Sequence, residues 1–365
     1  MNRLHVENRG SRDMAAVAVS AKSANSNNSK FRAICVKSNL RYRRMISPKY
    51  VFSLMGWALS LLLLFDRVKF PSRCLFQNEV VQVAVIEPKV LPYSDFLLVI
   101  FINNSPEGHK KRAALKKIYD RYRGHVFDTI ETENSRMYTL RVLYLTSSVD
   151  VDNDGELDGD VFKVKAPKGY EHIAEMTKQM MALTNHFSFK YLIKSDDDTF
   201  LCLRRLATLL STLPEDKLSK IYAGVPTACG VHRKNPNVGR VILDQSDRWY
   251  DSKFVEHTLG GLPCYPVYMQ GAFYVLAHSL VEFMNTGRPN WTTFQNEDVT
   301  VGSWLLGVDR EIVQVDNIEK AAIWGCKCST NNKETMKSSM FFHGCKTLEE
   351  LESCSKNLKK PGLLC

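Results

Sequence analysis

The chain has 365 residues, enough for one large domain or two small ones, and a formal net charge of +10. Residues 1–49 hold eleven Lys and Arg against two acids, a charge of +9 that leaves about +1 for the remainder. A nucleic-acid-binding domain needs its basic patch in the folded part, so this distribution excludes nucleic acid as the expected partner.

An uncharged stretch, YVFSLMGWALSLLLLF, follows the basic segment at residues 50–65. It is slightly shorter than a usual membrane span, a length that thin endomembranes tolerate. Because basic residues precede it, we expect a transmembrane signal anchor with residues 1–49 as a disordered cytoplasmic tail. A cleaved signal peptide, a buried core helix and a transit peptide at the Ser- and Arg-rich start are the alternatives.

Residues 66–94 predict an extended luminal stem, because three prolines interrupt them. Residues 95–365 then form the folded luminal domain, with a cysteine-rich end at 326–365. Nine cysteines lie beyond the anchor, so disulfides are expected there, with at least one cysteine unpaired or intermolecular. On that side of a membrane, Asn103 and Asn290 are candidate glycosylation acceptors.

The folded part begins with a continuous apolar run at residues 95–102, typical of a parallel strand buried on both faces. A helix at 109–123 and a strand at 139–146 follow. Later helices are expected at 170–187, 203–213, 278–284 and 296–306, and strands at 190–194, 220–225, 269–276 and 311–315. This alternation predicts an α/β domain with a mostly parallel sheet, whose ligands bind beyond the carboxyl ends of the strands.

Three adjacent carboxylates, Asp196, Asp197 and Asp198, follow the expected buried strand at 190–194. Like charges repel, so the triplet needs a cation or hydrogen-bond donors. Successive side chains of a strand point to opposite faces, so Asp196 and Asp198 can face the same way. Two converging carboxylates suit Mg²⁺ or Mn²⁺, ions that commonly bridge the phosphates of a nucleotide. A solvated turn is the alternative.

A second acidic pair, Glu297 and Asp298, opens the helix expected at 296–306. Acids at a helix start favour capping, but a rigid helix start can also position a general base. His343 lies in an apolar stretch, where a histidine is either structural or a metal ligand.

Two other metal sites are conceivable. A zinc site could combine Cys326, Cys328, His343 and Cys345, although this spacing is not that of the usual zinc modules. Residues 150–161 resemble the first half of a calcium-binding loop, but Val161 stands where such a loop has its bidentate Glu.

Four motifs occur in this chain in the same order as in one known family. They are residues 111–119 (KRAALKKIY), residues 159–161 (GDV) with Tyr170 and Lys178 beyond them, residues 194–200 (KSDDDTF) and residues 297–302 (EDVTVG). Across residues 95–365 the chain resembles the β-1,3-galactosyltransferase family of Golgi glycosyltransferases. The departures are Lys116 and Tyr119, where the family has Arg and Trp; Lys loses the bidentate fork of Arg.

The resemblance implies a GT-A fold, a nucleotide-sugar-binding α/β sandwich that uses Mn²⁺ and a UDP-sugar. It implies that Asp198 binds Mn²⁺, with His343 as a further ligand. Asp196 and Asp197 would contact the donor ribose or the water shell of the metal. Asp298 would be the base that deprotonates the acceptor hydroxyl.

By the same resemblance, Glu297 would orient substrate, and Arg112 and Lys116 would lie near the nucleotide. The implied reaction is inverting transfer of galactose from UDP-galactose to a 3-hydroxyl of an acceptor sugar on a glycoprotein, proteoglycan or glycolipid. The implied location is the Golgi membrane, as a single-pass type II protein with a luminal catalytic domain. Alternatives are transfer of N-acetylglucosamine or N-acetylgalactosamine, and a catalytically silent luminal chaperone or binding protein.

Overall fold

The structure is a computed structural model that describes residues 91–122, 137–230, 237–316, 324–326, 328, 333–358 and 365. The tail, anchor and nearly all of the stem expected at residues 1–94 lie outside these ranges and stay predictions. Within the described ranges, none of the helices has the length and apolar character to cross a membrane.

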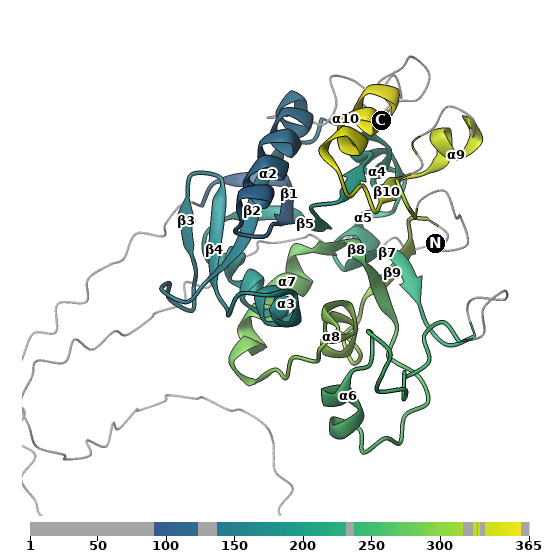
Figure 1. The fold of residues 1–365 in the computed structure, drawn as a ribbon. Helices are drawn as coiled ribbons and strands as arrows, with labels where there is room; N and C mark the ends of the chain where they lie inside the picture. Colours follow the sequence, from purple (N-terminus) through teal and green to yellow (C-terminus); the bar gives the residue numbers. More distant parts are fainter. Residues whose placement is uncertain are drawn as a thin grey trace, which may run out of the picture. The chain divides into compact units, whose positions relative to one another are not determined.

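A central eight-stranded sheet runs through the unit Ile86–Cys365. Its strand order is β3-β4-β2-β1-β5-β8-β7-β9 (Figure 1). The strands are β1 (Tyr93–Phe101), β2 (Leu140–Ser148), β3 (Glu156–Asp158), β4 (Val161–Lys165), β5 (Ser188–Asp196), β7 (Ile221–Thr227), β8 (Tyr268–Ala277) and β9 (Glu311–Gln314). Four of the seven pairings are parallel: β1–β2, β1–β5, β2–β4 and β7–β9. The expectation of an α/β fold with a mostly parallel sheet is therefore confirmed.

The two faces of the sheet carry two separate hydrophobic clusters. In β1, Phe96, Leu98 and Ile100 belong to one cluster, and the alternate residues Leu97 and Val99 belong to the other. Alternation with a period of two, apolar on both sides, is what a strand covered on both faces requires.

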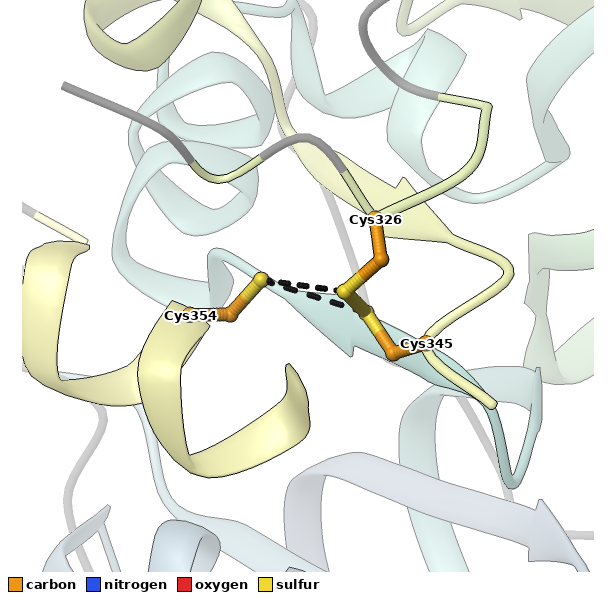
Figure 2. A group of neighbouring side chains, drawn as sticks. All are labelled: Cys326, Cys345 and Cys354. Carbon is orange, nitrogen blue, oxygen red and sulfur yellow. Dashed lines mark hydrogen bonds between the residues drawn. A yellow bond between two sulfur atoms is a disulfide. The ribbon is translucent and has the colours of Figure 1, made fainter. Parts of the chain in front are cut away.

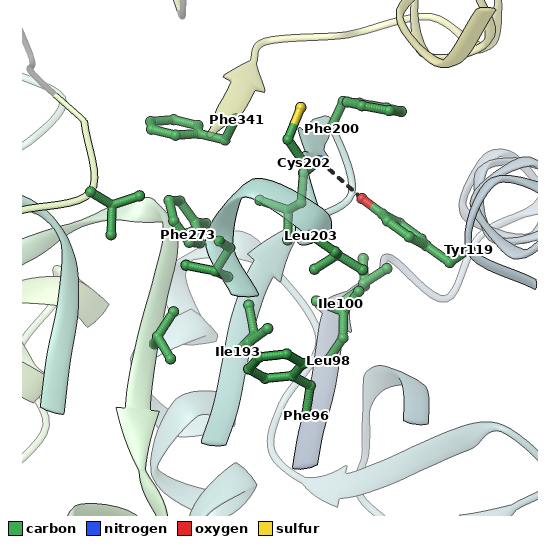
Figure 3. Packing of buried hydrophobic residues seen from close by; sticks show 14 of the residues in the cluster. Phe96, Leu98, Ile100, Tyr119, Ile193, Phe200, Cys202, Leu203, Phe273 and Phe341 are labelled. Carbon is green, nitrogen blue, oxygen red and sulfur yellow. Dashed lines mark hydrogen bonds between the residues drawn. The ribbon is translucent and has the colours of Figure 1, made fainter. Parts of the chain in front are cut away.

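Helices cover both faces (Figure 1). On the first face lie α2 (Pro106–Tyr119), α4 (Leu203–Ser211) and α10 (Leu348–Leu358). On the second lie α3 (Ile173–Met180), α7 (His278–Gly287) and α8 (Glu297–Trp304). Figure 3 shows the first cluster, where the hydroxyl of Tyr119 accepts a hydrogen bond from the backbone N–H of Leu201 at 3.1 Å. This bond ties α2 to the segment that follows the aspartate triplet.

A second, two-stranded sheet pairs β6 (Thr199–Leu201) with β10 (Phe341–His343) in antiparallel register. Among the described cysteines, four disulfides join Cys202–Cys365, Cys229–Cys264, Cys326–Cys345 and Cys328–Cys354. Figure 2 shows the Cys326–Cys345 bond, with the sulfur of Cys354 3.3 Å from that of Cys326. The disulfides use three of the zinc candidates, so the zinc alternative is wrong and the expectation of disulfides is confirmed.

Several expectations need correction. The sequence pattern assigned no direction to the strand expected at 269–276, and the corresponding strand β8 runs antiparallel to both of its neighbours. The helix expected at 170–187 is three pieces, since 3₁₀ turns at Tyr170–His172 and Met181–Asn185 flank α3. In the calcium-like loop, Arg288 and Asn185 both donate to the Asp154 carboxylate, and the described residues there form no three-ligand cluster.

Candidate functional site

The aspartate triplet lies at the carboxyl edge of the parallel half of the sheet. Strand β5 pairs with β1 up to Phe101↔Asp196, and β1 pairs with β2 up to Phe101↔Leu145. The ends of these three strands surround one cavity of about 490 Å³. Its lining includes Ile102, Asn103, Ser147 and all three aspartates. This is where ligands bind in open α/β sheets.

Asp198 is the buried member of the triplet, with 5% of its surface exposed. One carboxylate oxygen, Oδ2, contacts the ammonium of Lys346. The other, Oδ1, has no hydrogen-bond partner and lies 3.1 Å from His343 Nδ1, which is also 2.9 Å from the Thr199 hydroxyl. Burial opposes ionisation of this carboxyl, but His343 and Lys346 outweigh it and hold its pKa below the usual range.

Tertiary structure brings His343 to the triplet across 144 residues of sequence. The β6–β10 pairing aligns His343 with Thr199, and the backbone N–H of Cys345 donates to the Asp198 carbonyl at 2.9 Å. As a result, ligand atoms of Asp196, Asp198 and His343 lie within 4.8 Å of one another. Two carboxylates and one imidazole are a ligand set that can hold a divalent metal ion, and the carboxylate oxygen Asp198 Oδ1 has no hydrogen-bond donor.

A buried lysine, quoted in the motif at 194–200 but given no role there, connects the triplet to the second acidic pair. The Lys194 ammonium donates to Asp196 Oδ1 at 2.7 Å, to Glu297 Oε1 at 2.8 Å and to the Gly271 carbonyl. The Tyr274 hydroxyl donates to the other Glu297 oxygen at 3.2 Å. Burial disfavours the charge of Lys194, but the two carboxylates more than compensate and raise its pKa. Glu297 is therefore an internal counterion and does not cap α8 with its side chain.

Asp298 lies beside this network in the first turn of α8, half-buried. Its oxygens accept hydrogen bonds from the backbone N–H groups of Val299 at 2.8 Å and Gly271 at 3.1 Å. Burial, and next the charge of Glu297, raise its pKa to about 7. Asp298 does not line the 490 Å³ cavity; it reaches the triplet through Gly271, whose carbonyl binds Lys194. A carboxyl with this pKa can act as a base near neutral pH.

The cation found beside the triplet is not one of the two expected at the nucleotide. Lys111, which begins the motif at 111–119 but was given no role there, lines the 490 Å³ cavity and donates to Asp197 at 3.2 Å. Arg112 and Lys116 instead both bind Asp160, Lys116 at 2.9 Å, and line a different cavity on the first face of the sheet. Successive residues of a helix diverge by about 100°, which is why Lys111 and Arg112 point to different sites.

Other lining residues were assigned no role in the site from the sequence. Tyr170 is 65% exposed and Trp249 is 42% exposed, and both border the cavity, with the Arg248 guanidinium 4.3 Å above the Trp249 ring centre. Of the glycosylation candidates, Asn103 is exposed at the rim of this cavity, and Asn290 is exposed in a 3₁₀ turn away from it.

The sequence model described as Galactosyltransferase matches residues 136–316, which include the triplet and the Glu297–Asp298 pair. Probable beta-1,3-galactosyltransferase 5 of Arabidopsis thaliana is 22% identical, over 60% of this chain and 53% of its own length. Probable beta-1,3-galactosyltransferase 12 of the same plant is 35% identical, over 34% and 29%.

Two further matches have other names. UDP-GalNAc:beta-1,3-N-acetylgalactosaminyltransferase 2 of Xenopus tropicalis is 22% identical, over 50% of this chain and 34% of its own length. The chain thus spans about half or less of the length of these relatives. A crystal structure of a glycosyltransferase involved in the glycosylation of the major capsid of PBCV-1 aligns with a TM-score of 0.37 and 10% identity, over 72% of this chain and 98% of that one.

The family match and the geometry agree on the same residues. The matched region contains Asp196 and Asp198, two of the three residues that could hold a metal ion, and it also contains Lys194 and Asp298. These four residues belong to one connected network. The resemblance expected from the four sequence motifs is thereby confirmed, and residues 136–316 belong to the galactosyltransferase family.

Proposed function

We propose that the protein is an inverting glycosyltransferase of GT-A fold that moves galactose from UDP-galactose to a 3-hydroxyl of an acceptor sugar, forming a β-1,3 linkage. One observation carries the proposal. A chain of contacts runs from the metal-type ligands Asp196, Asp198 and His343 through Lys194 and Gly271 to Asp298. Relatives named β-1,3-galactosyltransferases support the choice of sugar and linkage.

The residues divide the chemistry between them. Asp196, Asp198 and His343 would hold Mn²⁺, which when bound offsets the negative charge that develops on the diphosphate leaving group. The ends of β1 and β2 would receive the nucleotide, with Lys111 nearby as a cation. Ionised Asp298 would accept the proton of the acceptor hydroxyl as that oxygen attacks the anomeric carbon opposite the diphosphate. Such single displacement inverts the anomeric centre, so an α-linked donor gives a β-linked product.

Lys194 and Glu297 act on position and charge. The three contacts of Lys194 hold Asp196, Gly271 and Glu297 in one arrangement. Glu297 contributes to the raised pKa of Asp298, and Lys194 partly opposes that effect. A base with a pKa near the working pH combines sufficient ionisation with a useful affinity for protons.

The described cysteines support the proposed compartment. Disulfides form and persist in oxidising environments, so the four among the described residues support a luminal catalytic domain. We propose residence in the Golgi membrane as a single-pass type II protein, with residues 50–65 as the anchor and a glycan on a secretory-pathway molecule as the acceptor.

The test measures UDP release by the full chain, expressed in a eukaryotic host, from UDP-galactose, UDP-N-acetylglucosamine and UDP-N-acetylgalactosamine, with and without Mn²⁺. Acceptors would span β-galactosides, xylosides and N-acetylhexosaminides. Mn²⁺-dependent turnover of UDP-galactose that is lost in Asp198→Ala and Asp298→Asn would support the proposal. Failure of UDP to bind at all would refute it.

A second candidate is transfer of N-acetylgalactosamine, which the name of the Xenopus relative favours. Transfer of N-acetylglucosamine is the third, and the same donor panel separates all three sugars. A silent binding protein has no need of a carboxyl with a pKa of about 7 next to a three-ligand metal-type cluster, which argues against that alternative.

A further inference from the structure

Each aspartate of the triplet has a lysine of its own. Lys194 binds Asp196, Lys111 binds Asp197 and Lys346 binds Asp198. The three ammonium groups balance three carboxylates that would otherwise repel one another. The lysines come from β5, α2 and the segment after β10, so only the tertiary structure assembles this pairing.

The three lysines differ in their freedom to move. The side chain of Lys194 is 1% exposed and has two further partners, and that of Lys111 is 14% exposed. The side chain of Lys346 is 73% exposed, and Asp198 is its one ion-pair partner among the described residues. A lysine side chain has a flexible four-carbon stem, so Lys346 can leave Asp198 at little cost in packing.

The backbone that carries Lys346 is held in place. Cys345 donates its N–H to the Asp198 carbonyl and forms a disulfide with Cys326, and His343 pairs with Thr199. Lys346 also lines the 490 Å³ cavity. Its ammonium can therefore still reach this cavity when it leaves Asp198.

We propose that Lys346 holds the place of the metal ion in the free protein and transfers to the diphosphate of the donor when the metal site fills. The inference rests on the proposed function. The contact of Lys346 with Asp198 Oδ2 lies at one of the ligand groups that the metal would use. A divalent ion there and an ammonium on the same carboxylate repel each other, so Lys346 must withdraw. The nearest new negative charge is the diphosphate, to which an ammonium donates strong, charge-assisted hydrogen bonds.

Lys346 would therefore weaken the binding of Mn²⁺ and strengthen the binding of the diphosphate. Lys346 competes with the metal for Asp198, so Lys346→Met should tighten binding of Mn²⁺ alone by about two- to fivefold, the range for an exposed ion pair. Lys346 also binds the diphosphate, so the same variant should weaken UDP binding in saturating Mn²⁺ by about tenfold or more. Damage to the structure would instead weaken both.

The experiment is calorimetric titration of the full chain with Mn²⁺ alone, and then with UDP in saturating Mn²⁺. Lys346→Met is compared with Lys346→Arg, which keeps the charge and should retain most UDP binding. Lys356→Met is the matched control, since it removes an exposed lysine of α10 that lines another cavity, between α10 and α2. It should change neither affinity. Asp198→Asn should abolish Mn²⁺ binding.

The outcomes separate the two levels of the proposal. Unchanged or weakened Mn²⁺ affinity in Lys346→Met, with Mn²⁺ still bound by the unaltered chain, would overturn the role of Lys346 alone. Unchanged UDP affinity in that variant would overturn its transfer to the diphosphate. Absence of Mn²⁺ binding in the unaltered chain would overturn the metal site and the role of Lys346 together.

Discussion

Lys194→Met is the most informative single perturbation of this site. The variant removes a buried ammonium that contacts Asp196 and Glu297 and leaves an apolar side chain of similar length. The Glu297 side chain is 7% exposed and would become an unpaired buried charge, whereas that of Asp196, at 28% exposed, would regain water. Removing one partner of a buried ion pair costs about 3–5 kcal/mol of the free energy of unfolding. We expect a loss in that range.

The assay is thermal unfolding of the full chain at one scan rate, with the disulfides intact. A loss of about 3–5 kcal/mol corresponds to a fall in Tm of roughly 6–20 °C. The matched control is Lys217→Met, because Lys217 makes a contact of nearly the same length, 2.7 Å, with Glu311 while both side chains stay 43% and 30% exposed. Such a pair contributes about 1 kcal/mol or less.

The pH dependence gives an internal check. Burial raises the pKa of Glu297 even with Lys194 present, and loss of the lysine would raise it further. In the variant, burial favours the protonated form of Glu297 in the folded chain. Stability is fully present below the pKa that a Glu has in the unfolded chain, and it is lost as pH rises through the higher pKa of the folded chain. The deficit should be smaller at pH 5 than at pH 8. Equal losses for Lys194→Met and Lys217→Met would refute the reasoning.

Three further predictions concern activity. Because the pKa of Asp298 is raised to about 7 and a base must be ionised, kcat/KM should rise with pH to half its maximum near pH 7; a midpoint near 4 would count against it. Gly271→Ala should lower kcat at least tenfold, since its Cβ would lie 2.7 Å from a Glu297 oxygen, whereas Gly307→Ala, with open space around it, should not. Lys111→Met should weaken UDP binding in a calorimetric titration by about tenfold, and unchanged affinity would remove Lys111 from the donor site.

Local patterns in the sequence predicted many of the helices and strands of the fold. Continuous apolar runs marked β1 and β5 because strands covered on both faces have no polar side, and those bounds differ from the observed ones by at most two residues. The same patterns did not reveal β3, β6 and β10, each of three residues, which are too short for periodicity to register. Nor did they indicate that β8 runs antiparallel, because direction depends on which partner strand is available.

The sequence by itself determined the family, the position of the triplet at a strand end and the acidic pair at a helix start, because each of these is a feature of consecutive residues. Tertiary structure alone decided what these groups contact. Lys194 meets Glu297 across 103 residues, His343 meets Thr199 across 144, and Lys346 meets Asp198 across 148. Charge balance in the site comes from side chains that different elements bring together. The spacing of residues along the chain does not reveal which side chains come close in space.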